Sequence, residues 1–117
     1  MSNEYFDDLS KRLRKFAEER DWDQFHAPKN LVMALSVEAA ELTEHFQWLT
    51  EAQSQNLDGD KLKEVAYEMA DIYIYLVRLA TKLNVDLPQF VEDKIILNEK
   101  KYPAEKVKGS SKKYTEY

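Results

Sequence analysis

The stretch VAYEMADIYIYLVRLA, residues 65–80, decides the fold class. Its only charged residues are Glu68, Asp71 and Arg78, and apolar side chains occupy every side of the helix that their spacing predicts. A helix with so little polar surface must be buried on most sides. Because a chain of 117 residues forms too few helices to enclose it, we expect a second subunit to cover part of this helix.

The composition agrees with a single all-α domain. Two glycines and three prolines are too few for the many tight turns of a β-sandwich or barrel, and 44% of the residues are hydrophobic. The length suits one domain with a real core rather than two. The chain contains no cysteine, which excludes disulfides, thiolate zinc sites and cysteine nucleophiles.

The charge and hydropathy patterns limit the classes of partner. A net charge of −5 argues against binding of nucleic-acid polymers. The longest apolar stretches carry charged residues, and no secretory signal is visible, so we expect no membrane partner and a cytoplasmic location.

Hydrophobic spacing predicts a protomer of four helices. They are expected over about residues 3–20, 31–50, 61–83 and 87–101. The polar segment 51–60 is expected to be a turn, and the chain after Pro103 to be mostly irregular. We therefore assign residues 1–103 to the domain and residues 104–117 to a Lys-rich tail, which either folds over a bound substrate or stays solvated.

Residues that are typical of helix N-termini stand at the start of three of these segments. Pro28 suits the first turn of the second helix, and Asn30 is an alternative cap for it. Asp58 or Asp60 is expected to cap the third helix, and Asp86 the fourth.

The second helix carries three glutamates that point in different directions. Its apolar stripe consists of Leu31, Leu35, Leu42, Phe46 and Leu49. At about 100° per residue, Glu38 lies about 40° from the centre of that stripe, Glu41 about 100° and Glu44 about 160°. Glu38 is therefore expected to face inward, Glu41 to lie at the border, and Glu44 to face water.

Glu38, Glu41, Glu68 and Asp71 form an inward quartet, for which three explanations compete. Buried ion pairs need cations, but residues 31–50 contain no lysine or arginine. A di-iron bundle needs Glu-x-x-His on two helices, which is absent here. A hard divalent cation, Mg²⁺ or Mn²⁺, suits a set of four carboxylates with oxygen ligands only, and we favour it.

The two carboxylate pairs, ExxE at residues 38–41 and ExxD at residues 68–71, resemble the motif of the MazG-like all-α nucleoside triphosphate pyrophosphatases. Longer segments are similar to the dCTP pyrophosphatase branch of that family. These segments are WDQFHAPKNL, EAAELTEHFQW, DIYIYLVRLA, VDLP, KYP and SSKKYTE. The resemblance extends over about residues 16–117.

The resemblance implies hydrolysis between the α- and β-phosphates of a deoxynucleoside triphosphate, which yields the monophosphate and pyrophosphate and requires Mg²⁺. It implies Glu38, Glu41, Glu68 and Asp71 as catalytic metal ligands, and active sites at helix-bundle interfaces of a homo-oligomer, which we expect to be a dimer of dimers, a homotetramer. Metal ions would neutralise the charge of the triphosphate, and a water would attack in line with the α-phosphorus. Glu41 is the expected orienter of that water.

Aromatic residues and a histidine are candidates for the base-binding part of the site. Trp22, Trp48 and Tyr75 are expected to stack on or edge a base, although core packing is the alternative for each of them. His26, in the loop near Trp22, is expected to hydrogen-bond the nucleotide, or else to be a surface histidine.

The fourth helix supplies candidates for phosphate or base contacts. Lys94 and Asn98 lie one turn apart and share a face with Leu87, so we expect them to point toward the interior. The alternative is a lysine that reaches the surface. Lys101 and Tyr102 are expected to extend the same substrate-binding edge.

The preferred function is hydrolysis of dCTP, extending to C5-modified dCTP. Two alternatives remain open. One is a broad MazG-type enzyme that acts on several deoxynucleoside triphosphates or on dUTP, and the other is a non-catalytic helical module whose acidic residues bind a structural cation.

Overall fold

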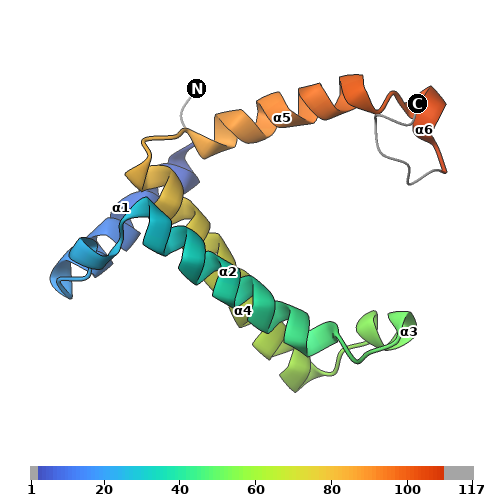
Figure 1. Ribbon diagram of the computed structural model, residues 1–117, viewed down its shortest axis with the longest axis horizontal. Helices are drawn as coiled ribbons and strands as arrows, with labels where there is room; N and C mark the ends of the chain where they lie inside the picture. Colours follow the sequence, from blue (N-terminus) through green and yellow to red (C-terminus); the bar gives the residue numbers. More distant parts are fainter. Residues whose placement is uncertain (1–2, 110–117) are drawn as a thin grey trace. The chain divides into compact units, whose positions relative to one another are not determined.

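The computed structural model describes residues 3–109, and all regular structure in that range is helical (Figure 1). The chain divides into a first compact unit that ends at Val85 and a second that begins at Asp86. The elements are α1 (Glu4–Glu19), the 3₁₀ turn η1 (Asp23–Phe25), α2 (Pro28–Phe46), α3 (Glu51–Ser54), α4 (Gly59–Lys82), α5 (Leu87–Lys101) and α6 (Ala104–Val107). The predicted all-α class is confirmed.

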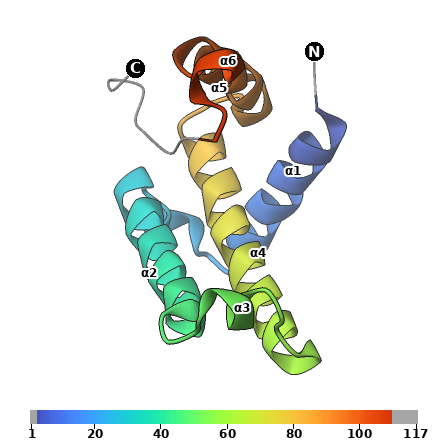
Figure 2. The ribbon, with the colours of Figure 1, turned by 90° about the vertical axis from the view of Figure 1, so that its right-hand side faces the viewer.

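The first unit is organised around α4. Helix α2 runs beside α4, and α1 packs against α4 as well (Figures 1 and 2). The buried apolar side chains are contributed by all three helices: Ala17, Leu31, Val65, Val77 and Ala80. The predicted α2 stripe is confirmed, because Leu31 is buried and the other four members are half-buried.

Capping side chains fix where the long helices begin. Asp58, one of the two predicted candidates, accepts a hydrogen bond from the Lys61 backbone N–H at 2.8 Å and so caps α4. Asp86 caps α5 as predicted, accepting from the Gln89 N–H at 3.3 Å.

For the start of α2, the structure confirms the predicted place of Pro28 but not Asn30 as the cap. Pro28 occupies its first turn, as predicted, and Ala27 is the N-cap residue without a side-chain hydrogen bond. Asn30 is the third residue of the helix, and its side-chain amide donates to the Phe25 carbonyl at 3.2 Å. The expectation that Asn30 caps α2 is therefore wrong.

Two short helices lie where irregular chain was predicted. Helix α3 forms because Thr50 and Gln53 make a reciprocal capping box, each accepting a hydrogen bond from the backbone N–H of the other. Helix α6 follows Pro103, which serves as its N-cap residue. The predicted boundary between domain and tail, after residue 103, stays a prediction.

Helix α4 exposes apolar side chains in the single chain. Tyr67 is 64% exposed, Met69 57% and Tyr73 42%. This is the helix whose composition predicts cover by another subunit, and that cover stays a prediction. Among residues 3–109, no helix is both long and apolar enough to cross a bilayer.

Candidate active site

Three carboxylates from two helices meet in the first unit. The three-residue spacing puts Glu38 and Glu41 on one side of α2, and the packing of α2 on α4 brings Glu68 to them. One oxygen from each of the three lies within 4.8 Å of the others, and all three residues are half-buried. Glu44 is exposed, as its angle predicts.

The three carboxylates of the cluster repel one another and, within the described part of the chain, lack a compensating positive charge. A hydrogen bond to Glu68, partial burial and the negative charge of Glu41 raise the pKa of Glu38 from 4.5 to about 7. The Oε2 atom of Glu68 is buried and has no hydrogen-bond partner. An orphaned oxygen among crowded carboxylates fits a divalent cation, because such an ion would satisfy the oxygen and remove the repulsion.

The two competing explanations for the acidic residues find no support among residues 3–109. The ion pairs of Arg78 and Lys82 are made to Asp23, away from the cluster. His45 lies 4.0 Å from Glu64 and is not one of the grouped residues. The donor set in the cluster therefore consists of carboxylate oxygens, which hard cations such as Mg²⁺ and Mn²⁺ prefer.

Asp71 lies one turn beyond Glu68 on α4 and is exposed. It is outside the group of three carboxylates, but it lines a pocket together with Glu38. Its role as a fourth ligand stays a prediction.

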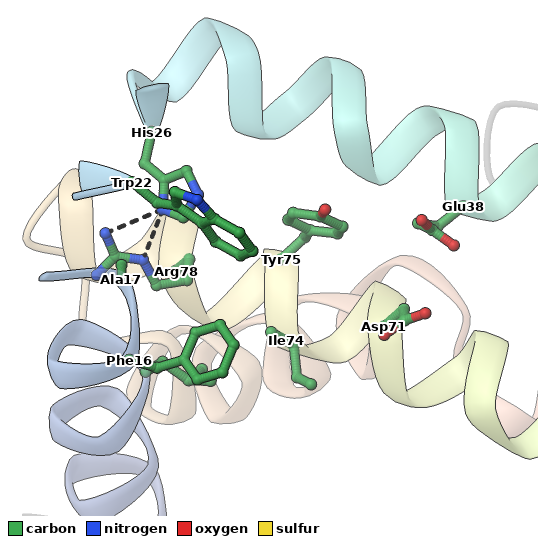
Figure 3. A pocket seen from close by; sticks show the side chains of 10 residues that line it. Phe16, Ala17, Trp22, His26, Glu38, Asp71, Ile74, Tyr75 and Arg78 are labelled. Atoms are coloured by element: carbon green, nitrogen blue, oxygen red, sulfur yellow. Dashed lines mark hydrogen bonds between the residues drawn. The ribbon is translucent and has the colours of Figure 1, made fainter. Parts of the chain in front are cut away.

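The pocket adjoins the acidic cluster and has a volume of about 430 Å³. It is lined by residues from α1, the α1–α2 loop, α2 and α4: Leu13, Phe16, Ala17, Trp22, His26, Glu38, Asp71, Ile74, Tyr75 and Arg78. Figure 3 shows Glu38 and Asp71 at one end, Trp22 and His26 at the other, and Tyr75 between them. The pocket is therefore acidic at one end and mainly aromatic at the other.

Backbone geometry at the end of α1 places Trp22. Asp21 adopts a left-handed conformation with φ of 55°. The Trp22 N–H then donates to the Ala17 carbonyl at 2.8 Å and the Asp21 N–H to the Glu18 carbonyl at 3.1 Å, which closes the helix with a Schellman motif. This turn sets the indole edge-on to Phe16, with ring centroids 5.7 Å apart.

Arg78 organises the loop end of the pocket. It is only 3% exposed, and its Nη2 donates to Asp23 Oδ1 at 3.0 Å. Lys82, one turn later on α4, contacts the same oxygen at 2.7 Å. Two hydrogen bonds lower the pKa of Asp23: the larger effect comes from the bond to Lys82 and the smaller from the bond to Arg78. The two cations thus hold the loop that carries Trp22 against α4.

Sequence reasoning missed Asp23, Phe16 and Ile74 in this site. The pairing of Asp23 with Arg78 joins residues 55 positions apart, and no local pattern announces it. Arg78 offered the only signal, because an arginine in an otherwise apolar stretch needs a partner.

Tyr75 lies within the pocket and is half-buried. Burial raises the pKa of its hydroxyl, and the charges of Glu38 and Asp71 raise it further, so the group is a neutral donor. Trp48, in contrast, is 86% exposed beyond the end of α2 and does not line the pocket. Its predicted stacking role stays a prediction.

The remaining predicted contacts belong to the second unit. Lys94 and Asn98 are exposed on α5 in the single chain, and the expectation that they face the interior stays a prediction. Lys101 ends α5 and Tyr102 follows it. Substrate contacts by these four residues stay predictions, and most of the Lys-rich tail lies outside the described residues.

Comparisons with known proteins find a matching family model, similar chains and a similar solved structure. The model of the MazG-like family matches residues 33–117. dCTP pyrophosphatase 1 from Homo sapiens is 43% identical over 112 residues, covering 94% of this chain, and its counterpart from Mus musculus is also 43% identical. The chain spans 66% of the length of these relatives. A solved pyrophosphatase from Archaeoglobus fulgidus is 34% identical, with a TM-score of 0.75 over 88% of this chain and 96% of that one.

Proposed function

The chain belongs to the MazG-like family, and on that premise we propose that it is a nucleoside triphosphate pyrophosphatase that hydrolyses dCTP to dCMP and pyrophosphate. The observation that carries the proposal is the meeting of Glu38, Glu41 and Glu68 beside a pocket with an aromatic end. The choice of cytosine as the base rests on the names of the relatives, which are dCTP pyrophosphatases. The extension to C5-modified dCTP belongs to the same proposal.

We propose that Glu38, Glu41, Glu68 and Asp71 hold Mg²⁺, with Mn²⁺ as a substitute. The orphaned Glu68 oxygen and the crowding around Glu38 support this assignment. When bound, the cation would neutralise charge that develops on the phosphate oxygens. The carboxylates themselves are too close together to carry full charge without it.

The protein side chains are proposed to orient the nucleotide and the attacking water. Glu38 and Asp71 lie at the acidic end of the pocket, which supports the proposal that the triphosphate binds there and the base at the end with Phe16 and Trp22. Glu41, at the border of the α2 stripe, orients the attacking water in this proposal. Trp48 is proposed as a second aromatic contact, and Tyr75 as a neutral donor between the two ends.

The second unit and a second subunit complete the proposal. Lys94, Asn98, Lys101 and Tyr102 are proposed to contact the phosphates or the base. We also propose a homo-oligomer, a dimer of dimers, whose contacts cover the exposed apolar side chains of α4. We propose a cytoplasmic location as well.

A substrate panel tests the base assignment. The protein is incubated with Mg²⁺ and each of dATP, dCTP, dGTP, dTTP, dUTP and 5-methyl-dCTP, and kcat/KM is measured for each nucleotide. The proposal expects the highest values for dCTP and its methylated form. Equal values for all bases support the broad MazG-type alternative, and a maximum for dUTP supports the dUTP alternative.

Matched variants separate an enzyme from a non-catalytic module. Glu68→Gln is expected to abolish hydrolysis while the helical spectrum and the oligomer persist. Glu44→Gln, on the exposed side of α2, is the control and is expected to retain activity. An inactive parent whose assembly collapses in Glu68→Gln would favour a structural cation.

A further inference from the structure

One ring nitrogen of His26 faces a group that can only donate hydrogen bonds. Arg78 Nε lies 3.4 Å from His26 Nδ1 and Arg78 Nη2 lies 3.2 Å from it, as the dashed lines in Figure 3 show. A guanidinium has five N–H donors and no acceptor, and it stays protonated in proteins. Nδ1 must therefore accept, so it carries no proton, and the neutral ring has its proton on Nε2.

Asp23 keeps the guanidinium in this position. Its Oδ1 accepts from Arg78 Nη2 at 3.0 Å and contacts Lys82 at 2.7 Å, so the carboxylate joins the loop to two cations on α4. Burial, followed by the positive charge of Arg78, lowers the pKa of His26, which keeps the ring neutral at neutral pH. Asp23 is thus a positioning residue, acting on His26 through Arg78.

The Nε2–H group of His26 is available for a ligand. His26 lines the pocket at the end opposite Glu38 and Asp71. Among residues 3–109, no hydrogen bond involves its Nε2. In the proposed orientation, with the phosphates at the acidic end, the uncharged base is the group nearest to His26. A neutral N–H donor matches a carbonyl oxygen, which accepts over a broad range of directions.

We infer that Arg78 holds His26 as the Nε2–H tautomer, and that this N–H donates a hydrogen bond to the O2 carbonyl of the pyrimidine base. The part of the inference that concerns the base rests on the proposed function, whereas the tautomer does not. His26 thereby hydrogen-bonds an acceptor on the base and does not bind the charged phosphates.

Nitrogen-15 NMR tests the tautomer in the free protein. The chain has two histidines, so His45→Gln assigns both rings by removing one set of signals. The His26 ring is expected to show a protonated Nε2 and an unprotonated Nδ1 at neutral pH. In Asp23→Asn, which keeps the size of the side chain but removes its charge, a mixture of tautomers is expected. A proton on Nδ1, or a doubly protonated ring, in the parent overturns the inference.

Kinetics with a modified base test the contact. His26→Ala is expected to raise the KM for dCTP about tenfold with kcat nearly unchanged, the effect of losing one neutral hydrogen bond. His26→Gln, whose amide can donate, is expected to restore part of the loss. His45→Gln is the matched control with parental constants, because His45 does not line the pocket.

The analogue 2-thio-dCTP replaces the carbonyl oxygen by a poorer acceptor. The parent is expected to discriminate against it about tenfold in KM, whereas His26→Ala is expected to treat both nucleotides alike. Equal discrimination by the two proteins overturns the contact while leaving the proposed function intact. If the parent hydrolyses no nucleotide, the proposed function and the base contact fall together, and the NMR spectrum still decides the tautomer.

Discussion

Raising the pH of the metal-free protein is expected to destabilise it through Glu38. The pKa of this carboxyl is about 7 in the folded protein and near 4.5 without its neighbours. Between these values the folded protein binds more protons than the unfolded chain, so stability falls as pH rises. The contribution is complete below about 4.5 and is lost as the pH passes through about 7.

The size of this effect follows from the pKa difference. At about 1.4 kcal/mol per pKa unit, the upper limit is about 3 kcal/mol. Because Glu38 is only half-buried, solvent screening reduces the expected loss to about 1 kcal/mol. For a chain of this length, that loss lowers Tm by about 3–6 °C between about pH 5 and about pH 8.

Thermal melts followed by circular dichroism measure the change, with EDTA or with saturating Mg²⁺. The variant Glu38→Gln is expected to show a weaker pH dependence than the parent in EDTA, whereas the control Glu44→Gln keeps the parental dependence. Mg²⁺ is expected to raise Tm more at the higher pH, because the cation binds the deprotonated cluster. The reasoning is refuted if Glu38→Gln and the parent have the same pH dependence, or if Mg²⁺ leaves Tm unchanged.

Three further variants test other parts of the structure. Leu31→Ala should lower the free energy of unfolding by about 2–5 kcal/mol in urea titrations, because Leu31 is 1% exposed, and a loss below about 1 kcal/mol would contradict its place in the core. Tyr73→Glu places a charge on the exposed apolar side of α4, so light scattering should report smaller assemblies, and an unchanged mass would locate the interface elsewhere. Lys94→Ala should raise the KM for dCTP tenfold or more if the lysine binds a phosphate, and a parental KM would remove it from the site.

The long helices were predictable because local chemistry determines them. The long apolar segment predicts α4, and Asp58 and Asp86 are N-cap residues that predict where α4 and α5 begin. Helix α3 was missed although its capping box is legible in the sequence as Thr50 followed by Gln53. The missed helix is short, and a polar composition is typical of both a turn and a single capped turn of helix.

The candidate site was predictable to the extent that helix geometry fixes it. The angles of Glu38 and Glu41 on α2 point them toward α4, and Glu68 meets them there. Asp71, one turn beyond Glu68 on α4, is exposed and lines the pocket, but it is outside the group of three carboxylates, and helical spacing alone does not tell these two positions apart. The contact of Arg78 with Asp23 depends on how the loop packs on α4, and helical spacing carries no information about that packing.

The products formed from dCTP test the central claim most directly. With Mg²⁺ and the parent protein, ion-exchange chromatography should show dCMP and pyrophosphate in equal amounts, with neither formed by a folded Glu68→Gln variant. Release of dCDP with single phosphate, or undiminished turnover in that variant, would contradict the assignment of the Glu38, Glu41 and Glu68 cluster to cleavage between the α- and β-phosphates.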